Sequence, residues 1–477
     1  RDIFAKGANW IPTDALPGRH NRQHYEELLE SAVQAHMNMI RVWGGGQYEY
    51  DYFYEICDQK GVLVWQDFMF ACAMYPSDPE FLDNVRQEAE YQVKRLKHHP
   101  SLALWCGNNE DIGALTWFKE SRENRDRYII DYDRLNEGVL AKTVKTIDPH
   151  RKWWSSSPSA GEGDYSDCWH DDSKGDMHYW SVWHEGKPFE AYYEVTPRFC
   201  SEFGFQSFPS VESITRFAPQ DQLNITSPIM EHHQKNDRGN SNIISTISRY
   251  FRFPESFEEI IYLSRVQQAM AIQTAVEYWR SQRPICMGTL YWQLNDNWPV
   301  ASWSSLEYGG KWKPLHYSAK RFYAPQHIVL IQEASEAGPT TIKIYGLNDD
   351  SQEIPGTLEI HLYTFAGALI DSTTQHTVIN SDSSTLLQNI TLPEDKDFSA
   401  SHFYYARFIP DNSDFQVCEN VAFLLRPKQC QIASAQIDVK VGTAEQASTP
   451  NATPKIASDF EITLKSDVPA FFVVLEI

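Results

Sequence analysis

Two glutamates in this sequence follow apolar runs of the kind that form buried strands. Glu110 comes after the run 102–107 and an Asn pair, and Glu202 follows Phe199-Cys200-Ser201. Two facing carboxyl groups are the least that hydrolysis of a glycosidic bond requires, because one must carry a proton while the other is ionised. A separation of about 5–5.5 Å would predict a retaining reaction through a covalent intermediate. From the pattern alone, the alternative of two solvated surface glutamates stays open.

The elements that must position these glutamates alternate between short apolar runs and amphipathic stretches as far as residue 323. Helical patterns lie between the runs, at 21–35, 48–60, 79–98 and 257–282. The helical pattern over 79–98 places apolar residues three and four apart along one face. We expect eight strands, over 3–10, 38–43, 62–67, 102–107, 152–156, 176–180, 198–203 and 286–294.

Eight alternations of strand and helix favour a closed (β/α)8 barrel over an open doubly wound sheet. No GxGxxG motif follows the first strand, which argues against a dinucleotide-binding fold. In such a barrel the reactive groups lie at the carboxyl ends of the strands. Glu110 and Glu202 would then face one another across the mouth, from the fourth and seventh strands.

Other polar and aromatic residues stand at the same predicted strand ends. We expect them to line the mouth and contact a substrate, although packing at the rim explains Trp43 and Trp292 equally well. Arg41 either pairs with Asp67 or holds the second carboxylate ionised by hydrogen bonding. The candidate binding residues are Asn9, Trp10, Arg41, Trp43, Asn109, His178, Tyr179 and Trp292.

Charge and composition exclude several other classes of protein. The 42 Lys and Arg against 64 Asp and Glu give a formal charge of −22, which would repel nucleic acid and anionic membranes. No run approaches the ~18 apolar residues of a membrane span, so we expect a soluble protein. The pairs His98-His99 and His232-His233 lack metal-ligand spacing, and we expect neither a metal nor a cofactor. The eight cysteines show no CxxC pair and are expected to be free thiols.

After Pro325 the pattern changes to alternating strands separated by turn residues. Predicted strands at 341–345, 358–363, 402–408 and 421–425 suit a β-sandwich of about 100 residues. The expected fold is therefore multidomain: a (β/α)8 TIM barrel over 1–325, an immunoglobulin-like β-sandwich over 326–430, and a partial C-terminal β-sandwich over 431–477. The apolar run 471–477 is predicted to be a strand without its hairpin partners.

Six blocks in the first 320 residues resemble the β-mannosidases of glycoside hydrolase family 2. They occur in the family's order and read KGANWIPTD, RVWGGG, VWQDFMFACAMYP, KRLKHHPSLALWCGNNE, SEFGFQSFPS and YWQLND. The resemblance implies that Glu110 is the acid/base and that Glu202 is the nucleophile forming a mannosyl-enzyme ester. Trp43 and Trp292 would shape the subsite for the terminal mannose, with Asn109 at its 2-hydroxyl. It implies an exo-acting retaining β-mannosidase whose partner is an oligosaccharide or glycoside.

The resemblance leaves alternatives open. Related β-galactosidases, β-glucuronidases, exo-glucosaminidases and endo-β-mannosidases share the barrel and the Glu pair. The family carries β-sandwich domains ahead of the barrel, so we expect this chain to be a fragment without the sugar-binding-like N-terminal domain. A non-catalytic carbohydrate-binding fragment is the alternative from another class. Bacterial cytoplasm or periplasm is expected rather than the lysosome.

Overall fold

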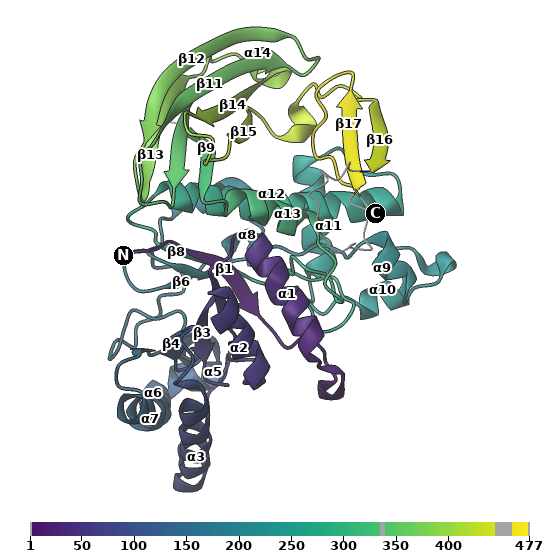
Figure 1. Ribbon diagram of the computed structural model, residues 1–477. Helices are drawn as coiled ribbons and strands as arrows, with labels where there is room; N and C mark the ends of the chain where they lie inside the picture. The colour runs from purple at the N-terminus through teal and green to yellow at the C-terminus, as the bar shows by residue number, and fades with distance from the viewer. Residues whose placement is uncertain (1, 334–338, 444–459, 476–477) are drawn as a thin grey trace, which may run out of the picture.

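The eight strands of the first part of the chain form one parallel sheet. The computed structural model describes residues 2–333, 339–443 and 460–475, and the sheet lies in the lower part of the molecule in Figure 1. Its strand order is β5-β4-β3-β2-β1-β8-β7-β6, which is sequence order continued around a ring. The strands are β1 Ala5–Trp10, β2 Met39–Val42, β3 Leu63–Asp67, β4 Leu102–Cys106, β5 Lys152–Trp154, β6 Met177–His178, β7 Cys200–Glu202 and β8 Gly288–Tyr291. All eight predicted strands are confirmed.

The two ends of this order, β5 and β6, meet through the segments next to them. The backbone N–H of Asp176 donates to the carbonyl of Ser159 at 3.3 Å. Asp176 Oδ1 accepts from the Ser159 N–H at 2.8 Å, and Asp176 Oδ2 accepts from Ser157 Oγ at 2.7 Å. The sheet is therefore curled into the predicted TIM barrel, and side-chain hydrogen bonds cross its seam.

Helices surround the sheet, and local sequence explains where the longest ones begin. Asp78 caps α3 by accepting from the Phe81 N–H, with Pro79 as the first helical residue. Ser256 and Glu259 form a capping box at the start of α12. The helices of this part are α1 Arg22–Gln34, α2 Asp51–Lys60, α3 Pro79–Leu96, α4 Asp111–Trp117, α5 Lys119–Glu123, α6 Arg125–Leu135, α7 Lys142–Ile147, α8 Ser181–His184, α9 Val211–Thr215, α10 Pro228–His232, α11 Gly239–Tyr250, α12 Phe257–Ser281 and α13 Pro314–Phe322.

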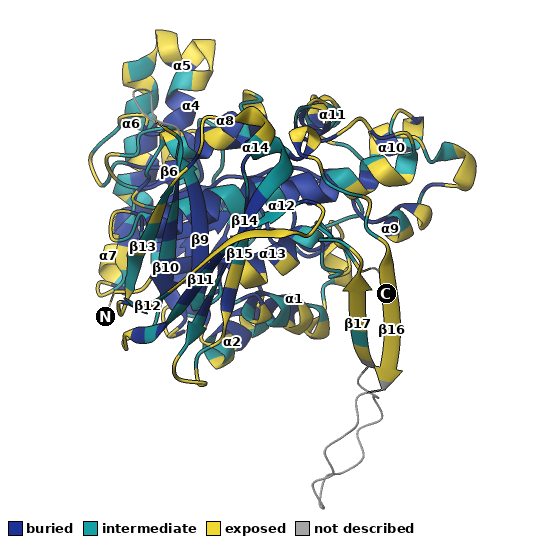
Figure 2. Ribbon diagram, turned by 90° about the horizontal axis from the view of Figure 1, so that it is seen from above, coloured by how far each residue is buried: buried dark blue, intermediate teal, exposed yellow. Residues whose placement is uncertain are grey.

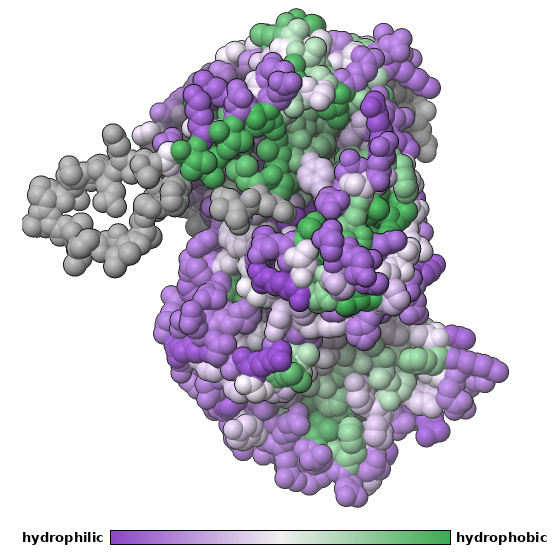
Figure 3. All heavy atoms as spheres, turned by 90° about the vertical axis from the view of Figure 1, so that its right-hand side faces the viewer, coloured by the Kyte–Doolittle hydropathy of each residue, from purple (hydrophilic) through white to green (hydrophobic). Residues whose placement is uncertain are grey.

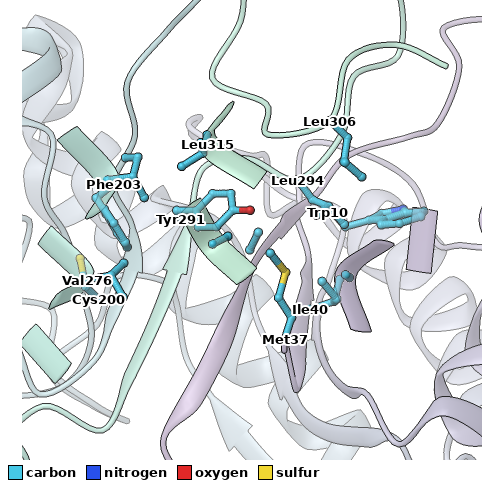
Figure 4. Close-up of a cluster of buried hydrophobic side chains, with 14 of the residues drawn as sticks. Trp10, Met37, Ile40, Cys200, Phe203, Val276, Tyr291, Leu294, Leu306 and Leu315 are labelled. Atoms are coloured by element: carbon cyan, nitrogen blue, oxygen red, sulfur yellow. The ribbon is translucent and has the colours of Figure 1, made fainter. Parts of the chain in front are cut away.

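The main apolar core lies between the outer face of the strands and these helices. Figure 4 shows part of it, where Ile40 of β2, Tyr291 of β8 and Leu315 of α13 are all buried. Side chains on the opposite face of the strands point into the barrel. The two faces alternate residue by residue along each strand, which decides which predicted site residues reach the mouth.

Antiparallel sheets follow the barrel and form the upper part of Figure 1. One sheet has the order β13-β10-β9 and the other β12-β11-β14-β15. Burial alternates along β11, with Leu358 and Ile360 inside, as expected for a sandwich strand that faces solvent on one side. The strands are β9 Gln326–Glu333, β10 Thr341–Asn348, β11 Ile354–Thr364, β12 Leu369–Ile379, β13 Ser383–Thr391, β14 His402–Pro410 and β15 Cys418–Phe423, with the short helix α14 Lys396–Ser401 before β14.

Helix α12 lies between the barrel and this sandwich and contacts β9, β10 and β13. At the same junction Asp349 pairs with Lys6 Nζ at 2.8 Å, Arg280 Nη2 at 3.1 Å and Arg283 Nη1 at 2.8 Å. One carboxylate from the sandwich thus compensates three cations from the barrel. The two parts therefore share a charged contact as well as an apolar one.

The last described strands, β16 Ile437–Thr443 and β17 Phe460–Ser466, form a two-stranded antiparallel hairpin. Its exposure is plain in Figure 2, and apolar side chains such as Val439 and Val441 lie on its surface. Figure 3 shows apolar surface gathered in this upper part of the molecule. The predicted strand at 471–477 is wrong for the described residues 471–475, where Phe471 instead packs against Phe403 and Phe423. The domain boundaries at 325 and 430 stay predictions.

All eight cysteines are free thiols, as predicted. Within the described ranges, no helix combines the length and apolar content needed to cross a bilayer.

Candidate active site

Glu110 and Glu202 both lie at the barrel mouth, one after β4 and the other at the end of β7. Glu202 is the last residue of β7, and Glu110 is the residue before α4. Glu110 has φ 63° and ψ 13°, a left-handed conformation that costs a non-glycine residue about 1–3 kcal/mol. Its N–H donates to the Ser157 carbonyl at 2.8 Å and its carbonyl accepts from Ala114 N at 3.0 Å. The surrounding backbone therefore holds this strained turn in place.

The two carboxyl groups meet in a shared, buried site. One oxygen of Glu110, one oxygen of Glu202 and a ring nitrogen of His178 all lie within 4.8 Å of one another. Glu110 is 7% exposed and Glu202 is 4% exposed. This spacing suits the retaining geometry of about 5–5.5 Å and is too short for the about 6.5–9.5 Å of inverting enzymes.

Arg41 of β2 contacts only one of these two carboxyl groups by a hydrogen bond among the described contacts. Its Nη1 donates to Glu202 Oε1 at 2.6 Å, and its Nη2 donates to Asp67 Oδ2 at 2.8 Å. Nη1 also donates to Asn9 Oδ1 at 2.9 Å, and Nη2 to Asn109 Oδ1 at 2.7 Å. Both predicted partners of Arg41, Asp67 and Glu202, are thus found at the same guanidinium. Glu110 receives no hydrogen bond from it among the described contacts.

This asymmetry separates the protonation of the two glutamates. Burial, and then the charge of Glu202, raise the pKa of Glu110 well above its usual range. Burial also raises the pKa of Glu202, but Arg41 opposes that rise by its charge and its hydrogen bond. The site therefore favours a proton on Glu110 and an ionised Glu202. Glycoside hydrolysis by two carboxyl groups needs this combination of one protonated and one ionised group.

Three further side chains surround the pair. His178 Nδ1 lies 2.6 Å from Glu110 Oε1 and 3.4 Å from Glu202 Oε2. Trp180 Nε1 donates to Glu202 Oε2 at 3.3 Å, and Cys72 Sγ donates to Glu110 Oε2 at 3.3 Å. The sequence predicts that Trp180 lines the mouth but does not mark it as a binding residue, and it does not single out Cys72. Trp180 lies in the predicted strand-end run with His178, whereas Cys72 is in an irregular segment that no spacing rule marks.

The structure brings most of the predicted binding residues together. Asn9, Arg41 and Asn109 form one hydrogen-bonded group with Glu202. The rings of Trp43 and Trp292 meet edge to face, with centroids 4.8 Å apart, and both are partly exposed. Partly exposed aromatic rings beside buried carboxyl groups can pack against the C–H faces of a sugar.

Trp10 and Tyr179 are corrections, because the structure buries both away from the carboxyl groups. Trp10 is in the apolar core of Figure 4, and its Nε1 donates to Glu49 Oε1 at 2.9 Å. Tyr179 donates its hydroxyl to the Ala191 carbonyl at 3.0 Å. Successive strand residues face opposite sides, so Asn9 points into the barrel and Trp10 points out. The same alternation separates His178 from Tyr179.

Glu110, His178 and Glu202 also have the residue types that can bind a metal ion. In the described ranges, no other cluster of His, Cys, Asp or Glu brings three such ligand atoms this close together. Each of the three already has partners in the protein: Cys72 on Glu110, Ser157 on His178, and Arg41 on Glu202. These hydrogen bonds account for the positions of the three side chains.

Comparison with known proteins shows which enzymes this chain is similar to. Residues 340–429 match the family model described as a mannosidase Ig/CBM-like domain. A β-mannosidase from Rattus norvegicus is 38% identical over 384 residues, covering 76% of this chain and 43% of its own length. The crystal structure of a β-D-mannosidase from Dictyoglomus thermophilum has a TM-score of 0.86 and 35% identity, covering 98% of this chain and 54% of that one.

This chain is a homologue of the β-mannosidases. The predicted resemblance and the fold class, a TIM barrel followed by β domains, are thereby confirmed. An exo-chitosanase from Amycolatopsis orientalis, at TM-score 0.70 and 15% identity, shares the fold. The β-mannosidase homologue spans less than half the length of the rat relative and about half that of the Dictyoglomus enzyme.

Replacing Arg41 by Met should destabilise this β-mannosidase homologue in a pH-dependent way. The change leaves Asp67 and Glu202 buried without the guanidinium, and we expect the free energy of unfolding at pH 7 to fall by about 3–5 kcal/mol. Without Arg41 both carboxyl pKa values rise further above their unfolded values, so the folded state binds more protons and gains stability as the pH falls. Urea unfolding at pH 7 and pH 5 should show the smaller loss at pH 5.

Arg22→Met is the matched control, because Arg22 makes exposed ion pairs with Glu26 and Glu55. It should change stability little at either pH. An equally large loss for Arg41→Met at both pH values would show that its charge does not compensate these carboxylates.

Proposed function

We propose that this chain is the catalytic part of a retaining exo-β-mannosidase, which hydrolyses terminal non-reducing β-D-mannose residues by double displacement. The observation that carries the proposal is the pair of carboxyl groups with oxygens within 4.8 Å, of which Glu202 alone accepts a hydrogen bond from Arg41 among the described contacts. We infer that the sugar is mannose because the rat and Dictyoglomus relatives are β-mannosidases.

In the first step, a carboxylate oxygen of Glu202 attacks the anomeric carbon while Glu110 donates its proton to the departing glycosidic oxygen. The bond to the leaving group breaks and a mannosyl ester of Glu202 forms. In the second step, Glu110 takes a proton from water, and the resulting hydroxide attacks the same carbon and releases Glu202. Arg41 keeps Glu202 ionised for the first step and stabilises it as the leaving group of the second.

The binding roles belong to the same proposal. Trp43 and Trp292 would form the walls around the terminal mannose, and Asn109 would reach its 2-hydroxyl. Asn109 is suited to this contact because Arg41 Nη2 holds its carbonyl at 2.7 Å, while its amide nitrogen donates to Cys72 Sγ at 3.3 Å. A substrate hydroxyl could replace the weak sulfur acceptor without disturbing the bond to Arg41. The partner would be an oligosaccharide or glycoside, and the bacterial compartment stays a prediction.

A panel of nitrophenyl glycosides tests the proposed specificity. The intact enzyme should release nitrophenol from the β-mannoside much faster than from the β-galactoside or β-glucuronide. Glu202→Ala should lower kcat by roughly a thousandfold or more, because no covalent intermediate can form. Glu212→Ala, which removes an exposed acid paired with Arg216, is the matched control and should keep full activity. A preference for galactoside or glucuronide would overturn the mannose assignment, and binding without turnover would indicate a carbohydrate-binding module.

Glu110→Ala should impair turnover according to the leaving group. Loss of the general acid should slow substrates with poor leaving groups by about 10²–10⁴-fold. Dinitrophenyl β-mannoside, whose leaving group needs no proton, should retain much more of its first-step rate. Steady-state and burst kinetics on a series of aryl mannosides measure this difference. Equal losses across the series would contradict the assignment of Glu110 as the acid.

A further inference from the structure

A row of buried polar side chains leads from Glu110 to a second buried carboxyl group, Asp176. Glu110 Oε1 lies 2.6 Å from His178 Nδ1, and His178 Nε2 lies 3.0 Å from Ser157 Oγ. Ser157 Oγ lies 2.7 Å from Asp176 Oδ2. All four residues are buried, with His178 and Ser157 fully inaccessible. The row crosses the seam between β5 and β6 described above.

The hydrogen-bond partners of Asp176 determine the direction of each bond in the row. Its Oδ1 accepts from Ser159 N at 2.8 Å and from Trp154 Nε1 at 2.9 Å. Its Oδ2 accepts from Ser157 Oγ at 2.7 Å and from Ser201 Oγ at 2.6 Å. Ser157 Oγ also lies 3.2 Å from Ser201 Oγ, but a carboxylate can only accept, so Ser157 uses its one hydrogen on the shorter bond to Asp176. Ser157 must therefore act as the acceptor toward His178.

This direction selects one tautomer of His178. Burial, and then the charge of Arg41, keep the pKa of His178 well below its usual range, so the ring is neutral. Its hydrogen is then on Nε2, where it donates to Ser157, and Nδ1 is an acceptor. Glu110 Oε1, at 2.6 Å from Nδ1, must supply the hydrogen of that bond. The whole row is satisfied when Glu110 is protonated and Asp176 is ionised.

We propose that Asp176 is a positioning residue for the reaction, acting through Ser157 and His178 to keep the acidic proton on Glu110. This inference rests on the proposed function of Glu110. The arrangement with the proton at the other end is reached by three transfers: Glu110 to Nδ1, Nε2 to Ser157, and Ser157 to Asp176. Burial raises the pKa of Asp176, but four hydrogen-bond donors oppose that rise. For Glu110, the charge of Glu202 adds to the rise that burial causes, so Glu110 remains the protonated end.

Other charged or titratable groups also face the two ends of the row. Those around Glu110 come from β2, β7, α4 and the segment after β3, and are Arg41, Glu202, Asp111 and Cys72. Those around Asp176 are the thiols Cys106, Cys168 and Cys200. None of these groups is altered in the variants below, so a change in the titration of Glu110 reports on the row.

Asp176→Asn is the decisive variant, because only one orientation of its side-chain amide satisfies the neighbouring donors. The Ser159 and Trp154 N–H groups require an acceptor at the Oδ1 position, so the amide nitrogen must face Ser157 and Ser201. Ser157 then accepts from the amide and is free to donate to His178 Nε2. His178 carries its hydrogen on Nδ1 and stabilises the Glu110 carboxylate. The alkaline limb of the kcat/KM pH profile should therefore move down by about one pH unit.

Loss of the Asp176 charge would also lower the pKa of Glu110 through space, and the double variant separates the two causes. In the Ser157→Ala background the row is broken, so adding Asp176→Asn should move the alkaline limb only by the through-space part, much less than in the wild-type background. The same downward shift in both backgrounds would overturn the proposal. Ser201→Ala is the matched control, because Ser201 contacts Asp176 and Ser157 without being a link between Asp176 and His178. Its alkaline limb should stay within a few tenths of a unit of wild type.

Nitrogen-15 NMR of His178 supplies a test that needs no turnover. The signal is identified by its loss in His178→Asn. Wild type should show hydrogen on Nε2, and Asp176→Asn should show it on Nδ1. Hydrogen on Nδ1 in the wild type would overturn the proposal even in an inactive preparation. An absent glycosidase activity with the expected tautomers would instead count against the proposed function and leave the row intact.

Discussion

The buried guanidinium of Arg41 is the interaction on which the rest of the site depends. It lies between two carboxylates, Asp67 and Glu202, and is fully inaccessible to solvent. A cation in this position must be compensated, and these two carboxylates must be compensated in turn. The consequence is chemical as well as structural. Arg41 favours the anionic form of Glu202 against the effect of burial, while burial and the charge of Glu202 raise the pKa of Glu110.

The barrel makes this arrangement possible because it brings distant parts of the chain to one end of the sheet. Asn9 and Arg41 are paired in register on β1 and β2. The Asn9 side chain accepts a hydrogen bond from Arg41, and Arg41 reaches Glu202 of β7 across the interior. Glu110 joins them from a strained turn whose backbone is held by Ser157, beyond β5. Ser157 therefore supports the site twice, through its carbonyl and through its hydroxyl bond in the row to Asp176.

Much of the fold could be predicted from the sequence, because apolar strand runs alternate with helices through the barrel. Glu110, Glu202 and Arg41 could be found because reactive groups in a barrel lie at strand ends. Trp10 and Tyr179 were placed wrongly because the prediction treated each strand end as a unit, whereas neighbouring residues face opposite sides. Cys72 could not be found, since its position depends on an irregular loop. The predicted strand at 471–477 failed because Phe471 packs under the sandwich instead of pairing with another strand.

The proposed reaction requires the two carboxyl groups to be close enough for Glu202 to attack the sugar directly. Proton NMR of β-mannoside hydrolysis, recorded before mutarotation, tests it most directly. Double displacement inverts the anomeric carbon twice, so β-mannose should form first and the α-anomer should grow in later. α-Mannose as the first product would mean a single displacement by water, and would contradict the role of Glu202 as nucleophile.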